Sequence, residues 1–255
     1  MARRRRRRYV NTASFYQSNS KEEWDYLLKP INYHYHFGFP GISENIFENS
    51  IYQNVFPFIA DNSRILDCGC GWGAPAEMLV THKKCKVTSV TNSLMQVKFI
   101  QDNFKNIKVK YKDLNVFKPL NRYDCAMFIE SFSHVINQQK LLKNISLVTD
   151  NILFIAHLDR SPKGFFQKDW LMKFESVPNL IKKLKNVGYT VQFIKDLGTD
   201  YIIPTYSYWL SRVENINNVK GQLLELKNLC QASLSNPQAT AEYSGLFIIY
   251  ASKNL

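Results

Sequence analysis

A glycine-rich turn between a short strand and a helix constrains the fold of this chain more than any other feature. Residues 65–66 are Ile-Leu, residues 67–73 are Asp-Cys-Gly-Cys-Gly-Trp-Gly, and residues 76–80 have the composition of a helix. The order strand, turn, helix is typical of a parallel sheet with crossover helices. Glycine lets the backbone pass close to a ligand, and the free N–H groups at the start of the helix favour an anionic group. The sequence therefore predicts a ligand site beyond the carboxyl end of this strand.

The alternation of strands and helices continues along the chain. Short β-type runs occur at residues 64–68, 86–90, 108–111, 125–129, 151–156, 190–194 and 246–252. Helices are predicted at residues 22–28, 46–59, 76–80, 178–186 and 219–232, with Pro30 and Pro57 near the ends of the first two. Aromatic stretches at 33–40 and 201–209 are interpreted as loops, the first of them ordered. The pattern predicts an α/β fold: a mostly parallel, seven-stranded sheet with helices on both faces and an aromatic-rich cap.

The length of 255 residues fits one large α/β domain. We expect a basic, disordered tail at 1–20 and a single domain at 21–255. Within that domain, 21–60 would form an N-terminal lid and helices, 61–160 the ligand-binding core, and 161–255 a C-terminal half with a substrate-cap insertion at about 200–243. No apolar run is long enough to span a bilayer, and five unevenly spaced cysteines make a poor disulfide framework. We therefore expect a cytoplasmic protein, either a monomer or a homodimer.

The formal net charge of +12 raises the question of a nucleic-acid partner. Six of these charges belong to the arginine run at residues 3–8, which leaves +6 for the rest of the chain. An arginine run at a terminus is usually a solvated tail, and contact with RNA or a membrane surface is the alternative interpretation. Because the body of the chain is only mildly basic, we expect no nucleic-acid partner.

The glycines alone do not select the cofactor, because Gly69, Gly71 and Ala74 also fit the G-x-G-x-x-G/A pattern of dinucleotide sites. Asp67, however, stands two residues before Gly69, where dinucleotide sites usually carry no acid. A carboxylate there can accept a hydrogen bond from a cofactor amino group. Residues 87–93 contain no Asp or Glu, although a dinucleotide site needs one there to bind the ribose. Both observations favour S-adenosylmethionine over a nicotinamide cofactor.

Three further motifs follow the turn in order. Residues 90–96 are Val-Thr-Asn-Ser-Leu-Met-Gln, and Asp113-Leu114 follows the third predicted strand. Residues 123–135 begin with a Tyr-Asp pair and run through the fourth predicted strand. Together with the turn they resemble class I S-adenosylmethionine-dependent methyltransferases, in the subgroup of tocopherol C-methyltransferases, coclaurine N-methyltransferases and cyclopropane-fatty-acid synthases. The resemblance covers residues 55–160 well. Cys68 and Cys70 depart from it, and we interpret both as small core residues rather than as metal ligands, so no metal is expected.

The resemblance implies S-adenosyl-L-methionine as the cofactor and S-adenosyl-L-homocysteine as its product. In this subgroup hydroxyl and amide groups stand where other methyltransferases use an acid at the second strand, and the carboxylate after the third strand receives the adenine amino group. The implied cofactor residues are Tyr33, His36, Asp67, Gly69, Cys70, Gly71, Thr91, Asn92, Gln96, Asp113, Leu114 and Glu130.

Glu130, His134 and His157 are the candidate catalytic residues. Glu130 and His134 are four apart and would share a face near the transferred methyl if this segment is helical, and His157 ends the fifth strand. A sulfonium is already an activated donor, so the protein mainly orients the attack and excludes water, and a base serves only some acceptor atoms. The alternative interpretation of Glu130 and His134 is structural, as a polar pair at the start of a helix.

Two histidines and five aromatic residues from several parts of the chain are the candidate acceptor-binding set. Its members are Tyr16, His34, His134, Trp170, Tyr206, Trp209 and Tyr243. We expect N-, O- or C-methylation of a small, partly apolar natural product of secondary metabolism, a lipid or a short peptide. An RNA methyltransferase that uses the arginine run and a non-catalytic methyltransferase-like binding module are the alternatives. The segment after the fourth strand lacks the Asn/Asp-Pro-Pro-Tyr motif of many RNA enzymes.

Overall fold

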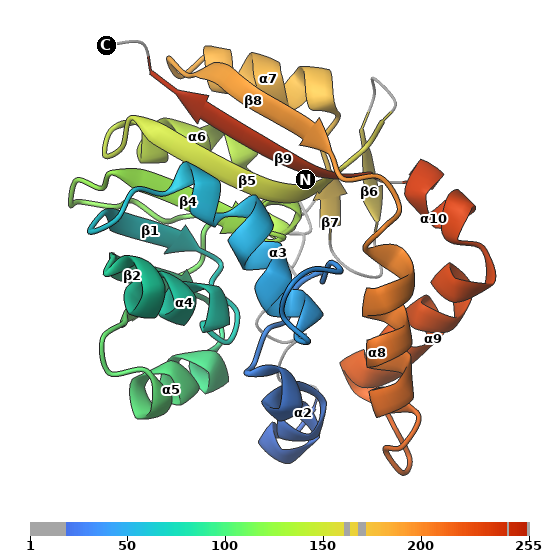
Figure 1. The fold of residues 1–255 in the computed structure, drawn as a ribbon. Coiled ribbons are helices and arrows are strands. Elements are labelled where there is room, and N and C mark those ends of the chain that lie inside the picture. The colour runs from blue at the N-terminus through green and yellow to red at the C-terminus, as the bar shows by residue number, and fades with distance from the viewer. Residues whose placement is uncertain (1–18, 161–163, 168–171, 244, 254–255) are drawn as a thin grey trace, which may run out of the picture.

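The architecture is one large sheet with helices on both faces (Figure 1). The structure is a computed structural model that describes residues 19–160, 164–167, 172–243 and 245–253. The sheet has the order β3-β2-β1-β4-β5-β9-β8, in which β9 runs antiparallel to β5 and β8 and the other pairings are parallel. Its strands are β1 (Arg64–Cys68), β2 (Lys86–Thr91), β3 (Lys108–Tyr111), β4 (Cys125–Ile129), β5 (Asn151–Leu158), β8 (Thr190–Asp196) and β9 (Gly245–Ser252). All seven predicted strands are confirmed, four of them with longer bounds.

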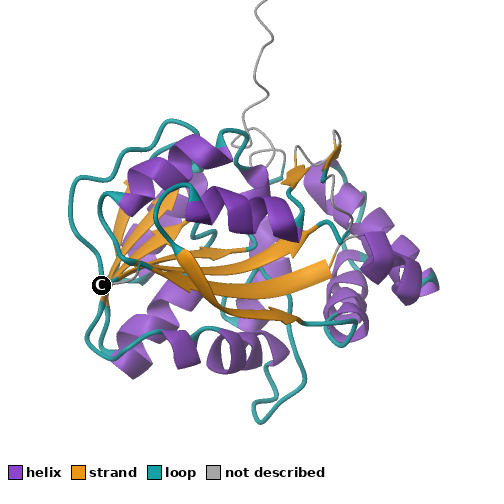
Figure 2. Cartoon of the chain, turned by 90° about the horizontal axis from the view of Figure 1, so that it is seen from above, coloured by secondary structure: helices purple, strands orange, loops and turns teal. Residues whose placement is uncertain are grey.

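The central strands are buried on both faces, which explains their nearly continuous apolar sequence. Successive side chains of a strand point to opposite faces, so Ile65 joins one core and Leu66 the other. The first core packs against α3 (Ile46–Asn54), α4 (Ala74–Lys83) and α5 (Leu94–Asn103), and the second against α6 (Gln138–Ser146) and α7 (Val177–Lys185). Figure 2 shows the sheet between these two layers of helices.

The N-terminal segment begins with α2 (Lys21–Leu28), whose start is fixed by a capping box between Ser20 and Glu23. One 3-10 turn at Lys29–Ile31 contains Pro30 and ends the helix. The predicted helix at 46–59 is shorter than expected, because α3 ends at Asn54 and a 3-10 turn at Phe56–Phe58 follows. Residues 33–40 between the two helices form an ordered loop, as predicted.

The cap beyond the carboxyl end of β5 is helical, and here one sequence prediction was wrong. Residues 202–209, interpreted as a loop, belong to α8 (Ile202–Val213). Ile202, Tyr206, Trp209 and Val213 recur at helical spacing and are buried, and Pro204 lies in the first turn, where a helix tolerates it. The cap continues with α9 (Gly221–Ser235), which confirms the helix predicted at 219–232, and α10 (Pro237–Tyr243).

A second, two-stranded sheet, β6 (Phe165–Gln167) and β7 (Met172–Phe174), was not predicted. All five cysteines are buried and unpaired. Within the described ranges, no helix combines the length and apolarity needed to cross a membrane, and no three His, Cys, Asp or Glu side chains gather as metal ligands would.

Candidate active site

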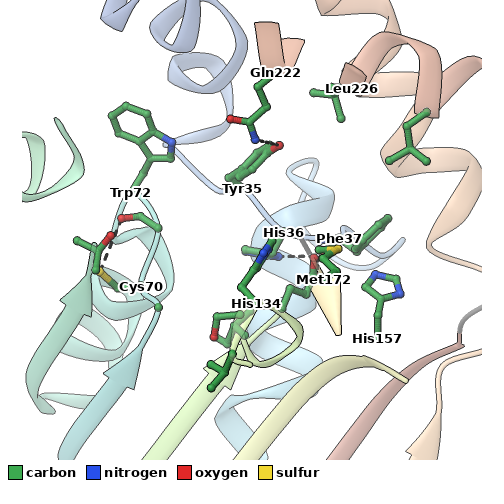
Figure 3. A pocket seen from close by; sticks show the side chains of 18 of the residues that line it. Tyr35, His36, Phe37, Cys70, Trp72, His134, His157, Met172, Gln222 and Leu226 are labelled. Atoms are coloured by element: carbon green, nitrogen blue, oxygen red, sulfur yellow. Dashed lines mark hydrogen bonds between the residues drawn. The ribbon is translucent and has the colours of Figure 1, made fainter. Parts of the chain in front are cut away.

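A cavity of about 470 Å³ opens at the carboxyl ends of β1, β2, β4 and β5. Such a volume suits a cofactor or a small ligand. Every one of the twelve predicted cofactor residues lines this cavity, from Tyr33 in the N-terminal loop to Glu130 after β4. The three candidate catalytic residues line it as well. Figure 3 shows side chains of this lining, which come from the N-terminal loop, the glycine-rich turn, the strand ends and the cap.

The glycine-rich turn is held close to the sheet and leaves room for a ligand. The backbone N–H groups of Gly69 and Cys70 both donate to the carbonyl of Val90, at 2.9 and 3.0 Å, which ties the turn to β2. Gly69 and Gly71 have φ of +83° and +53°, in the left-handed region that favours glycine. A Cβ on Gly71 would meet no heavy atom within 4 Å, so the backbone there faces open space. This exposed backbone can approach a ligand directly.

Asp67 closes the inner wall of the cavity beside the turn. Its side chain is 2% exposed and accepts one long hydrogen bond, 3.4 Å from the Ser89 hydroxyl. Burial raises the pKa of Asp67 to about 7, although the Ser89 hydrogen bond opposes the shift. A buried carboxyl group with so few donors has capacity for hydrogen-bond donors from a ligand.

Polar side chains at the ends of β2 and β3 form the next part of the wall. The Thr91 hydroxyl donates to Gln96 Oε1 at 2.6 Å, which fixes the amide of Gln96. Gln96 Nε2 is buried and has no hydrogen-bond partner among the described residues. The backbone N–H and the amide of Asn115 hold Asp113 Oδ1 at 2.9 and 3.0 Å. A cofactor with acceptor groups near Gln96 and donor groups near Asp113 fits this wall.

Glu130 lies where β4 ends. It separates the polar half of the cavity, beside the glycine-rich turn, from an aromatic half on the side of the cap. Its φ of +53° is in the left-handed region, so the segment from Glu130 to His134 is not an α-helix and the two side chains do not share a helical face. The chain bends at Glu130 and forms a single 3-10 turn at Phe132–His134. Both side chains still reach the cavity. Glu130 Oε1 accepts a 2.7 Å hydrogen bond from the backbone N–H of Phe37, and burial raises its pKa to about 8.

The two histidines beyond the sheet are held neutral by burial, which lowers the pKa of His134 and of His157 to about 4. His134 Nδ1 is buried and has no hydrogen-bond partner among the described residues. The His157 ring lies edge-on to Phe37, with 4.8 Å between ring centroids. Neutral imidazoles at these positions can donate or accept a hydrogen bond without adding charge to the cavity.

His34 and His36 differ in their access to the cavity. His36 lines it, whereas His34, which was predicted to contact the acceptor, does not. His34 is 1% exposed and lies behind His36, with 2.9 Å between His34 Nδ1 and His36 Nε2. His36 Nδ1 lies 3.0 Å from the Phe37 carbonyl, which can only accept, so His36 carries its proton on Nδ1 and accepts from His34.

Aromatic side chains dominate the half of the cavity beyond Glu130. Phe37 is the centre of this cluster, with its ring centroid 5.4 Å from those of Tyr206 and Trp209. Tyr206 and Trp209, which were predicted to contact the acceptor, both line the cavity. Tyr16 and Trp170 lie outside the described residues, and Tyr243 belongs to α10 but its side chain is not described. The cavity-lining residues that were not predicted include Tyr35, Phe37, Met172, Phe174, Gln222 and Leu226.

Comparisons with known proteins agree with this geometry. Residues 65–151, from β1 to the start of β5, match the family model described as a methyltransferase domain. This stretch of the chain is therefore similar to methyltransferase domains. The (S)-coclaurine N-methyltransferase of Thalictrum flavum subsp. glaucum is 26% identical over 195 residues, which is 68% of this chain and 54% of that protein. This chain thus spans about half the length of the curated relatives it matches.

Two solved structures have the same fold. Coclaurine N-methyltransferase bound to N-methylheliamine and SAH superposes with a TM-score of 0.76 at 20% identity, covering 95% of this chain and 81% of that one. The cyclopropane synthase MmaA2 from Mycobacterium tuberculosis gives 0.77 at 13% identity and covers 95% and 97%. These likenesses and the sheet order confirm the predicted Rossmann-like class I methyltransferase fold.

Proposed function

We propose that this protein is an S-adenosylmethionine-dependent methyltransferase that methylates the nitrogen of a small, partly apolar amine. The observation that carries the proposal is the division of one cavity into two chemically different halves. Asp67, the glycine-rich turn and Gln96 line the polar half, and Phe37, Tyr206 and Trp209 belong to the aromatic half. Glu130 lies at the boundary.

The hydrogen-bonding groups of the polar half match those of the cofactor. Asp67 and Asp113 can accept from amino groups, the buried Gln96 amide can donate, and the backbone at Gly71 leaves space for close approach. The cofactor supplies a methyl group already activated by its sulfonium. Tyr33 and His36 would then close this half from the N-terminal loop.

The aromatic half fits a protonated or neutral amine. Ring faces at Phe37, Tyr206 and Trp209 attract cations and bury apolar groups. Glu130 is the acidic residue on this side of the cavity, and its pKa of about 8 lies near those of amines and near physiological pH. Its carboxylate form, which becomes populated as the pH approaches 8, would take the amine proton and leave the nitrogen lone pair free to attack. The names of the curated relatives, which include coclaurine and pavine N-methyltransferases, support nitrogen as the acceptor atom.

The alternatives have weaker support. An RNA methyltransferase would rely on the arginine run, which lies outside the described residues, and deletion of residues 1–8 would then abolish activity. A non-catalytic module would not need the unsatisfied Gln96 amide or the under-paired Asp67. A lipid or short peptide is the alternative acceptor class. The single-domain organisation and a cytoplasmic location are part of the same proposal.

Calorimetry with S-adenosylmethionine tests the cofactor claim, and the absence of measurable binding would refute it. Incubation with labelled cofactor and a cell extract, followed by mass analysis of the labelled product, tests the activity and identifies the acceptor. Label on a small amine supports the proposal, whereas label on RNA, on lipid or on no product contradicts it.

A further inference from the structure

Lys21 of α2 lies in a cage of three aromatic rings behind the polar half of the cavity. Its ammonium is 5.4 Å from the ring centroid of Tyr33, 5.8 Å from that of Trp72 and 4.9 Å from that of Phe99. The other cation–π contacts in the described ranges place a cation over one ring each. The rings also pack on one another, with 4.1 Å between the Tyr33 and Phe99 centroids and 5.4 Å between those of Trp72 and Phe99.

The cage joins four segments that are distant in the sequence. Lys21 comes from α2, Tyr33 from the N-terminal loop, Trp72 from the glycine-rich turn and Phe99 from α5. Asp25, one helical turn after Lys21, completes it. Asp25 Oδ1 accepts hydrogen bonds from the Lys21 ammonium and, at 2.9 Å, from the Tyr33 hydroxyl. The Lys21 side chain is 35% exposed, so its charge is only partly solvated.

The cage shares two of its members with the cavity. Tyr33 and Trp72 line the polar half, whereas Lys21 and Phe99 do not. Tyr33 has a φ of +61°, which costs a non-glycine residue energy and persists only where neighbours hold it. Burial and the hydrogen bond to Asp25 raise the pKa of Tyr33 to about 12, so its hydroxyl stays protonated and donates. The Tyr33 ring, which lines the cavity, is thus held on its other side by Lys21 and Asp25.

We propose that Lys21 is a positioning residue for the cofactor, because its ammonium fastens the N-terminal segment 19–40 to the glycine-rich turn and holds that segment closed over the bound cofactor. This rests on the proposed function. Loss of the ammonium would leave the rings packed but would deprive Asp25 of its cation and loosen Tyr33. The cofactor would then dissociate faster, while the chemical step, which takes place in the other half of the cavity, would change little.

The test compares Lys21→Met, which keeps the length and loses the charge, with Lys21→Arg, whose guanidinium also stacks on rings. Lys29→Met is the matched control, because Lys29 is an exposed lysine of the same segment and does not line this cavity. We expect Lys21→Met to raise the Kd and KM for S-adenosylmethionine about 5- to 10-fold and to speed release of S-adenosylhomocysteine, with kcat at saturation within twofold. Lys21→Arg should recover most of the affinity, and Lys29→Met should match the wild type.

Each outcome bears on one claim. A wild-type chain that binds no S-adenosylmethionine refutes the proposed function. Wild-type binding with an unchanged Kd in Lys21→Met refutes the role of Lys21 alone, as does an arginine variant as weak as the methionine one. If Lys21→Met fails to fold, Asp25→Asn keeps the ammonium over the rings and removes its anion, and the same selective rise in KM is expected. A variant that lowers kcat as much as it raises KM overturns the proposal.

Discussion

The two halves of the cavity are built in different ways. The polar half comes from successive strand ends and their turns, residues 67–73, 91–96 and 113–115, held by short-range contacts within neighbouring β-α units. The aromatic half is assembled from the N-terminal loop, the end of β5, β7 and the three cap helices, which are far apart in the sequence. The first half therefore follows from the α/β pattern itself, and the second depends on how distant segments pack together.

The cavity holds two carboxyl groups with a raised pKa, one in the polar half and one at its boundary with the aromatic half, and the supports of the two groups differ. Asp67 lies within a strand and receives one long hydrogen bond from a side chain. Glu130 lies at a strained bend and receives a short one from the backbone of Phe37 in the N-terminal loop. The first group is fixed by the sheet, and the second depends on the loop that covers the cavity. We expect the first to control cofactor affinity and the second to control the chemistry.

The largest effect is expected from Glu130→Gln, which keeps the shape and the hydrogen bond with Phe37 but removes the base. With the amine acceptor identified by labelling, kcat should fall about 10²- to 10³-fold. Calorimetry should give a Kd for S-adenosylmethionine within threefold of the wild type. If the Kd rises as much as kcat falls, the separation of roles between the halves is wrong.

Asp67→Ala is expected to produce the opposite pattern. Removal of a charged acceptor from a buried site should weaken cofactor binding about 30- to 100-fold, because ligand donors would then face no partner. The variant should keep a measurable kcat at high cofactor concentration. Asp67→Asn, which retains one acceptor oxygen, is the control and should lose less affinity. Unchanged binding in Asp67→Ala would remove the cofactor claim.

The sequence predicted the first half better than the second for a physical reason. Asp67 and Thr91 lie at the carboxyl ends of predicted strands and Asp113 follows a third, and parallel strands bring their carboxyl ends to one edge. Phe37 and Tyr35 were within a loop identified as ordered, but no local pattern shows that this loop crosses the cavity. The error at residues 201–209 has a similar source, because the helical spacing of Tyr206 and Trp209 becomes decisive only once α9 covers that face.

A third prediction concerns stability and pH. The pKa of Glu130 is raised from 4.5 to about 8 by burial, so between those values the unfolded chain ionises this group while the folded chain keeps it protonated. The contribution of the protonated Glu130 to the stability of the folded chain is fully present below about pH 4.5 and is lost as the pH rises toward 8. The side chain of Glu130→Gln does not titrate, so the Tm of the variant should rise relative to that of the wild type, by about 5–10 °C between pH 5 and pH 8. Scanning calorimetry at both pH values measures this, and a constant difference would contradict the raised pKa.

The smallest effect is expected from a substitution at the mouth of the aromatic half. The change in KM there should depend on which acceptor is used rather than on the cofactor. Ala232 of α9 and Ala239 of α10 line the cavity and are exposed, so they mark an opening between the two helices. In Ala232→Phe the larger ring narrows this opening without touching Asp67 or Glu130. The KM should rise about 3- to 5-fold for a bulky amine and less than twofold for a small one, because one added ring in an open mouth costs about 1 kcal/mol of binding. Gln231→Phe places the same ring on the neighbouring exposed position, which does not line the cavity, and should change neither KM. If the two acceptors lose equally in Ala232→Phe, the acceptor enters elsewhere, and the aromatic half selects by charge rather than by size.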